Sequence, residues 1–126
     1  MRKLISSGSP FEPQIGFSRA VRVGPFVAVS GTAPIAPDGG TAAPGDLYGQ
    51  TKRCLEIIVA ALREAGAGPE HVVRTRIFAT SAAIFEEVAR AHGAVFGETR
   101  PACTYVVTQL IDPRWHVDIE AEALLA

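Results

Sequence analysis

Apolar and polar residues alternate most regularly near the C-terminus, between Val117 and Ala123. Apolar residues occupy every second position of this run, and carboxylates fill the positions between them: Asp118, Glu120 and Glu122. Side chains that alternate with a period of two point to opposite faces of a β-strand. The run therefore predicts a strand with one apolar face and one acidic face.

Earlier in the chain, short runs with the pattern of strands precede the first helical segment. Lys3 to Ser6 predicts a short edge strand, followed by a loop to about Gly16. Two runs on either side of Gly24-Pro25, residues 18–23 and 26–29, predict a hairpin whose second strand ends at Ser30-Gly31.

Two further strands are expected in the second half. The run from Val72 to Thr80 is rich in β-branched residues, and its alternation predicts one face with Val73, Thr75, Ile77 and Ala79 and another with Arg74, Arg76 and Phe78. The segment from Arg100 to Gln109 contains a proline near its start, which excludes a helix interior, and continues with a strand-like composition.

Two segments have the three- and four-residue spacing of amphipathic helices. The first follows Asp46, a good N-cap residue, and stops at Gly66. The second runs from Ile84 to Phe96, and Gly97 is placed to end it. Cys54 falls on the apolar face of the first helix and is interpreted as a core thiol, whereas all three histidines are interpreted as surface or loop residues: His71, His92 and His116.

This order of elements predicts an α/β fold with both helices on one face of the sheet. The apolar faces of the strands then pack against the helices, which leaves the carboxylates of the last strand on an open face. Arg74 and Arg76 offer countercharges, so Asp118 and Glu122 are interpreted as members of a polar network. A small sheet with one uncovered side also predicts oligomerisation.

Composition limits the partners. The 126 residues predict one domain, and the formal net charge of -1 without a basic stripe gives no indication of a nucleic-acid partner or an anionic membrane. Cys54 and Cys103 lack metal or redox spacing, which favours a reduced intracellular protein. No run has the length of a signal peptide or of a membrane span, so a cytoplasmic location is expected.

Several short motifs resemble the reactive-intermediate deaminase family, also called Rid or YjgF/YER057c. They follow the family's order across nearly the whole chain: Gly16–Ala20, Gly24-Pro25, Val29–Gly31, Arg100–Thr104 and Val117–Ala121. The resemblance implies a single Rid-like domain over residues 1–126, with a chorismate-mutase-like fold whose mixed sheet carries two helices on one face. It also implies a homotrimer in which the open sheet faces form a central barrel, with small-metabolite pockets between subunits.

In the best-known branch of that family, the substrates are enamines and imines, such as 2-aminoacrylate, and neither metal nor organic cofactor is used. Glu120 matches the family glutamate thought to position or activate water, a role that suits a general base. Where that branch has an arginine that holds the substrate carboxylate, this chain has Cys103. The resemblance thus implies a catalytic Glu120 and a substrate unlike 2-aminoacrylate-type acids.

The resemblance also implies substrate-binding residues that border one pocket with Glu120: Phe17, Ser30, Gly31, Cys103 and Thr104. Arg19 lies two residues from Phe17 and is a candidate to replace the missing arginine, as are Arg76 and Arg100. Two functions stay open, hydrolysis of an enamine or imine and non-catalytic metabolite binding by a regulatory or protective trimer. RNA cleavage, sometimes attached to the family by name, has no support from charge or from a base-stacking motif.

Overall fold

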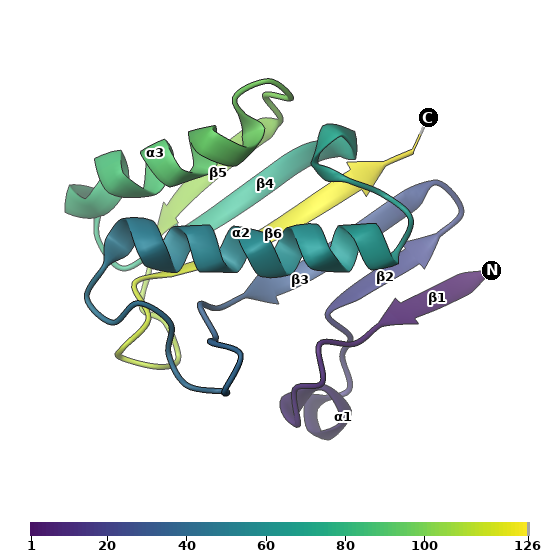
Figure 1. The fold of residues 1–126 in the computed structure, drawn as a ribbon, viewed down its shortest axis with the longest axis horizontal. Helices are drawn as coiled ribbons and strands as arrows, with labels where there is room; N and C mark the ends of the chain where they lie inside the picture. The colour runs from purple at the N-terminus through teal and green to yellow at the C-terminus, as the bar shows by residue number, and fades with distance from the viewer. Residues whose placement is uncertain (126) are drawn as a thin grey trace.

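A six-stranded mixed sheet carries two long helices on one face in this computed structural model, which describes residues 1–125 (Figure 1). The strands lie in the order β1-β2-β3-β6-β4-β5, and β4 and β5 run parallel. The strands are β1 (Arg2–Ile5), β2 (Ala20–Val23), β3 (Phe26–Thr32), β4 (Val72–Ala79), β5 (Ala102–Val107) and β6 (Val117–Leu124). The helices are α1 (Phe11–Ile15), α2 (Leu47–Glu64) and α3 (Phe85–Phe96), with single 3₁₀ turns η1 (Pro69–His71) and η2 (Ala82–Ile84).

Helix α2 begins and ends where its sequence predicts. The Asp46 carboxylate accepts a hydrogen bond from the Gly49 amide at 2.9 Å, which satisfies one of the unpaired donors of the first turn. Its apolar face, including Cys54 and Leu55, is buried against the sheet, and Gly66 follows in the left-handed conformation (φ 88°). The interpretation of Cys54 as a core thiol is confirmed, and burial strongly raises its pKa.

Helix α3 packs beside α2, and His92 lies on the side that faces the sheet. The His92 ring is half-buried, and its Nε2 lies 2.9 Å from the Thr75 hydroxyl of β4. Burial lowers the pKa of His92, which favours the neutral ring. The interpretation of His92 as a surface residue is therefore wrong, because the sheet-facing side of α3 includes this position.

Strand β6 lies in the middle of the sheet, between β3 and β4 (Figure 1). Its alternate apolar residues from Val117 to Ala123 are almost fully buried beneath the helices, whereas Asp118, Glu120 and Glu122 are on the opposite face. The alternation predicted for this strand is confirmed. The face with the three carboxylates is called the open face below.

Two irregularities in the sheet change which residues face the core. The pairing of β4 with β6 shifts between Val72 and Arg74, so Val72 is buried while Val73 is 49% exposed. The placement of Val73 on the buried face is therefore wrong. Likewise, β3 continues past the predicted end at Ser30-Gly31 to Thr32, with a register shift that begins at Val29.

The expected N-terminal loop contains a short helix, α1, which ends at Gly16 with φ 88°. None of the helices within residues 1–125 is long and apolar enough to cross a membrane.

Candidate functional site

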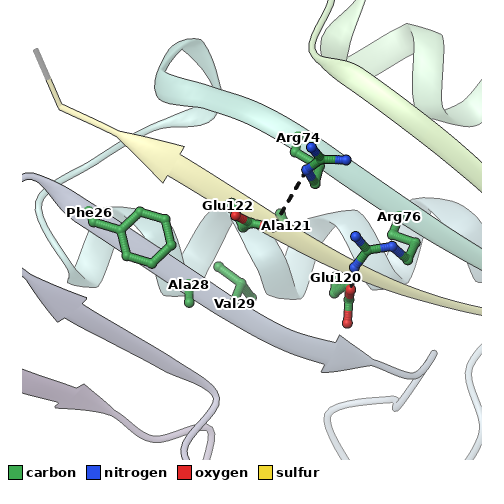
Figure 2. A pocket seen from close by; sticks show the side chains of 8 residues that line it. All are labelled: Phe26, Ala28, Val29, Arg74, Arg76, Glu120, Ala121 and Glu122. Carbon is green, nitrogen blue, oxygen red and sulfur yellow. Dashed lines mark hydrogen bonds and ion pairs between the residues drawn. The ribbon is translucent and has the colours of Figure 1, made fainter.

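A shallow hollow lies on the open face, over β3, β6 and β4 (Figure 2). Arg76 forms an ion pair with Glu120 across adjacent strands, and Arg74 Nε lies 3.7 Å from Glu122 Oε1. The lining combines these four charged residues with apolar ones: Phe26, Ala28, Val29 and Ala121. The predicted countercharges therefore do pair with two of the three carboxylates.

Thr104 belongs to the same row of the open face as Glu120. In the sheet register, Arg76 is paired with Glu120 on one side and with Thr104 on the other. Paired residues of neighbouring strands point to the same face of a sheet. The structure thus brings two predicted site residues together, with Arg76 between them.

Cys103 lies on the other face of the sheet. It pairs with Thr75, which is fully buried beneath the helices, and Thr75 pairs in turn with Ala121 of β6. Since β5 is at the edge of the sheet, the thiol remains exposed there. Within one chain, Cys103 and Glu120 therefore do not border the same pocket.

The segment before β2 supplies a second group of predicted residues, centred on Arg19. Arg19 NH1 donates to the Gly31 carbonyl at 2.6 Å and to the Thr32 hydroxyl at 2.9 Å, while its guanidinium carbon lies 5.6 Å from the centre of the Phe17 ring. Ser30 Oγ donates to the Ser18 carbonyl at 2.6 Å. Arg19 thus fastens this segment to the end of β3, and burial lowers its pKa.

The charge of Glu12 on α1 interacts with that of Arg19. The Glu12 side chain is buried and accepts a hydrogen bond from the Ser7 amide at 3.0 Å. Burial opposes ionisation of Glu12, yet the hydrogen bonds from Ser7 and the charge of Arg19 lower its pKa overall. The sequence offers little to predict this role for Glu12, because its only signal is a single acid in a segment rich in serine and proline.

Asp118 lies between the charged residues of the hollow, such as Glu120, and the group of residues centred on Arg19. A Cβ atom placed on Gly31 would lie 2.9 Å from Asp118 Oδ1, so the missing side chain of Gly31 leaves room for this carboxylate. Burial raises the pKa of Asp118 to about 6, and Glu120 adds to the rise while Arg19 opposes it. Within residues 1–125, no ion pair includes Asp118, so unlike Glu122 it does not join the salt-bridged network expected for it.

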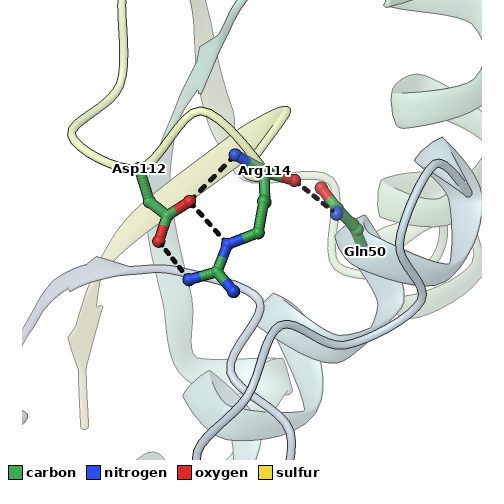
Figure 3. A network of polar contacts seen from close by, with 3 residues as sticks. All are labelled: Gln50, Asp112 and Arg114. Carbon is green, nitrogen blue, oxygen red and sulfur yellow. Dashed lines mark hydrogen bonds and ion pairs between the residues drawn. The ribbon is translucent and has the colours of Figure 1, made fainter.

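The loop that leads into β6 is fixed to α2 by Gln50 (Figure 3). The fully buried Gln50 amide donates to the Arg114 carbonyl at 3.0 Å and accepts from the His116 amide at 2.9 Å. Arg114 also forms a fork with Asp112, which lowers the Asp112 pKa to about 2. These contacts set where β6 starts, at Val117, one residue before Asp118. Sequence analysis did not identify Gln50.

Comparison with known proteins agrees with this architecture. The family model described as Endoribonuclease L-PSP matches residues 8–125. The chain belongs to the YjgF/Rid family. Its predicted family and its YjgF-like fold are therefore confirmed.

Individual relatives of this YjgF/Rid chain extend along almost its entire length. The crystal structure of Rv2704 from Mycobacterium tuberculosis, a member of the YjgF/YER057c/UK114 family, is 43% identical, has a TM-score of 0.89, and is matched over 99% of this chain and 100% of that one. SCO2049 of Streptomyces coelicolor is 41% identical over 120 residues, 94% of this chain and 89% of its own. The 3-aminoacrylate deaminase RutC of Acinetobacter baylyi is 28% identical over 120 residues, 95% of this chain and 94% of its own.

Proposed function

We propose that this YjgF/Rid protein hydrolyses a small imine or enamine at the open face, with Glu120 handling the water. The observation that carries the proposal is the position of Glu120, which borders the hollow on the uncovered face beside Arg76. A relative named 3-aminoacrylate deaminase, 28% identical along nearly the whole chain, supports the reaction class. No cofactor is part of this proposal.

The chemistry needs few groups. A water molecule adds to the carbon of the C=N bond, Glu120 takes a proton from that water, and the proton then passes to the nitrogen. As the C–N bond breaks, the remaining hydroxyl proton also moves to the nitrogen, which leaves a carbonyl compound and ammonia. Arg76 keeps the Glu120 carboxylate oriented for the first step, since paired ions of this kind fix each other's geometry.

The substrate is proposed to differ from 2-aminoacrylate-type acids. Position 103 carries a thiol in place of a cation, and the Arg19 guanidinium is bound to Gly31 and Thr32 of its own chain. Arg76 is paired with Glu120. Both of these candidate replacements for the missing arginine are therefore already paired with groups of the chain itself. The third candidate, Arg100, is exposed after α3.

We further propose a homotrimer in which neighbouring chains complete the pockets and the open faces form a central barrel. One face of the sheet has no covering layer within residues 1–125, and it exposes Phe26 by 39% beside the charged pairs. In such an assembly, Cys103 and Thr104 on the edge strand of one chain approach Glu120 of another. Sedimentation equilibrium should give a mass of three 13.3 kDa chains, and a monomer across the concentration range would contradict the assembly.

The hydrolysis is tested with imines generated in solution. A flavin amine oxidase acting on 3-methylbutylamine supplies an imine without a carboxylate, and an amino-acid oxidase acting on leucine supplies a matched 2-imino acid. Semicarbazide traps either imine, so faster hydrolysis appears as slower semicarbazone formation. The proposal predicts slower trapping for at least one imine, and unchanged trapping for both would contradict hydrolysis of these imines.

One observation favours the alternative, a metabolite-binding trimer without catalysis. Glu120 already forms an ion pair with Arg76, as expected of a carboxylate with a structural role. A metabolite that raises the melting temperature and is recovered unchanged would support this second function.

A further inference from the structure

Three arginines lie on or beside the open face, and each is held by acceptors of its own chain. Arg19 bonds to the end of β3, Arg76 pairs with Glu120, and Arg74 lies near Glu122. These contacts neutralise part of the positive charge that an anionic ligand would need. One carboxylate of this face, by contrast, forms no ion pair within residues 1–125.

That carboxylate is Asp118. Its neighbour on β4 is Phe78, which carries no charge, and the groups that influence it electrostatically are Arg19 before β2 and Glu120 on β6, while its own charge acts on the buried Cys54 thiol of α2. The backbone of Thr32 on β3 supplies a hydrogen bond. Burial raises the pKa of Asp118 to about 6 even though Arg19 and the Thr32 backbone stabilise the ionised form, and a cationic ligand in contact with the carboxylate would add to that stabilisation.

We propose that the open-face site selects substrates that carry a protonated nitrogen and no carboxylate, and that Asp118 holds this nitrogen beside Glu120. The inference rests on the proposed hydrolysis for its reaction. Its substrate class is small imines derived from primary amines, which are cationic when protonated. Asp118 acts here as a specificity-determining residue, while Glu120 keeps the role of handling water.

The spacing of the two carboxylates suits separate roles, with Asp118 holding the nitrogen and Glu120 handling the water. Residues two positions apart on a strand lie roughly 6–7 Å apart along it and share one face. A nitrogen at Asp118 and a water at Glu120 then leave space between them for the carbon that is attacked. Asp118 Oδ1 packs closely against Gly31, where a Cβ atom would lie only 2.9 Å from it, so a side chain at position 31 would displace the carboxylate.

Ligand binding tests the inference without relying on turnover. Butylammonium and butyrate are matched in length and opposite in charge, and both are titrated into the full chain at pH 7.5 while amide chemical shifts are recorded. We expect butylammonium to bind about tenfold more tightly than butyrate, and Asp118→Asn to remove that preference. Asp38→Asn, which removes the same charge from an exposed loop, should bind like the wild type.

The pH dependence gives a second readout. The ionised form of Asp118 binds the cation, so affinity should be constant well above pH 6 and fall about tenfold per unit as Asp118 becomes protonated below it. Asp118→Asn should show no such fall. A fall that persists in this variant, or equal binding of the two ligands, would overturn the inference.

Its failure is distinct from failure of the proposed function. Hydrolysis of the leucine-derived imino acid in preference to the amine-derived imine, with butyrate bound as well as butylammonium, would keep hydrolysis and reject the role of Asp118. Asp118-dependent binding of butylammonium without hydrolysis of either imine would reject the enzyme and retain the cation site.

Discussion

Glu120→Gln is expected to lower the rate of imine hydrolysis by roughly 10²–10⁴-fold, the range usual for loss of a general base. The amide keeps the shape of the side chain but cannot take a proton from water. Glu86→Gln on the exposed side of α3 is the matched control and should leave the rate unchanged. The measurement is the initial rate of semicarbazone formation with each variant.

Stability separates this effect from damage to the fold. The Arg76–Glu120 pair is partly exposed, with side chains 35% and 32% accessible, so its loss should cost no more than about 1 kcal/mol of unfolding free energy. A Glu120→Gln protein that is folded and as active as the wild type would remove Glu120 from the chemistry. Urea denaturation supplies the stability value.

Gln50→Met is expected to destabilise the protein by about 1–3 kcal/mol, because it leaves a partly buried carbonyl and a partly buried amide without their partners. The two groups are the Arg114 carbonyl and the His116 amide, both of which bond to the fully buried Gln50 side chain. Methionine has a similar volume, so a cavity adds little to the loss.

The exposed Gln14→Met variant controls for the change in composition and should stay within about 0.5 kcal/mol of the wild type. Chemical denaturation of both variants measures the difference. Equal stability of the two would show that the loop before β6 finds other partners. Because this loop leads to Asp118, we also expect Gln50→Met to weaken butylammonium binding.

Much of the fold is predictable from local pattern. The alternation in β6 shows which of its residues face the helices, and Asp46 and Gly66 mark the ends of α2. The two register shifts are not predictable in this way, because each depends on how a strand pairs with distant β6. As a result, the local pattern alone places Val73 on the wrong face and ends β3 too early.

In the candidate site, too, some features follow from local pattern and others depend on contacts with distant parts of the chain. Glu120 and Thr104 lie on the open face as the period-two pattern requires, and Arg76 connects them. Period two also separates Cys103 from Glu120 within one chain, a consequence that appears only once the pairing of β5 with β4 is known. The internal partners of Arg19 lie 11–13 residues away, so its use within the fold cannot be inferred from its neighbours in sequence.

The central claim is that the face carrying Glu120 catalyses hydrolysis of a C=N bond. Its most direct test is the rate of semicarbazide trapping of the 3-methylbutylamine-derived imine at increasing, substoichiometric concentrations of the wild-type protein. The account predicts that trapping slows in proportion to the protein added, with many imine molecules hydrolysed per chain. Trapping that stays unchanged even when the protein equals the imine in concentration would contradict it.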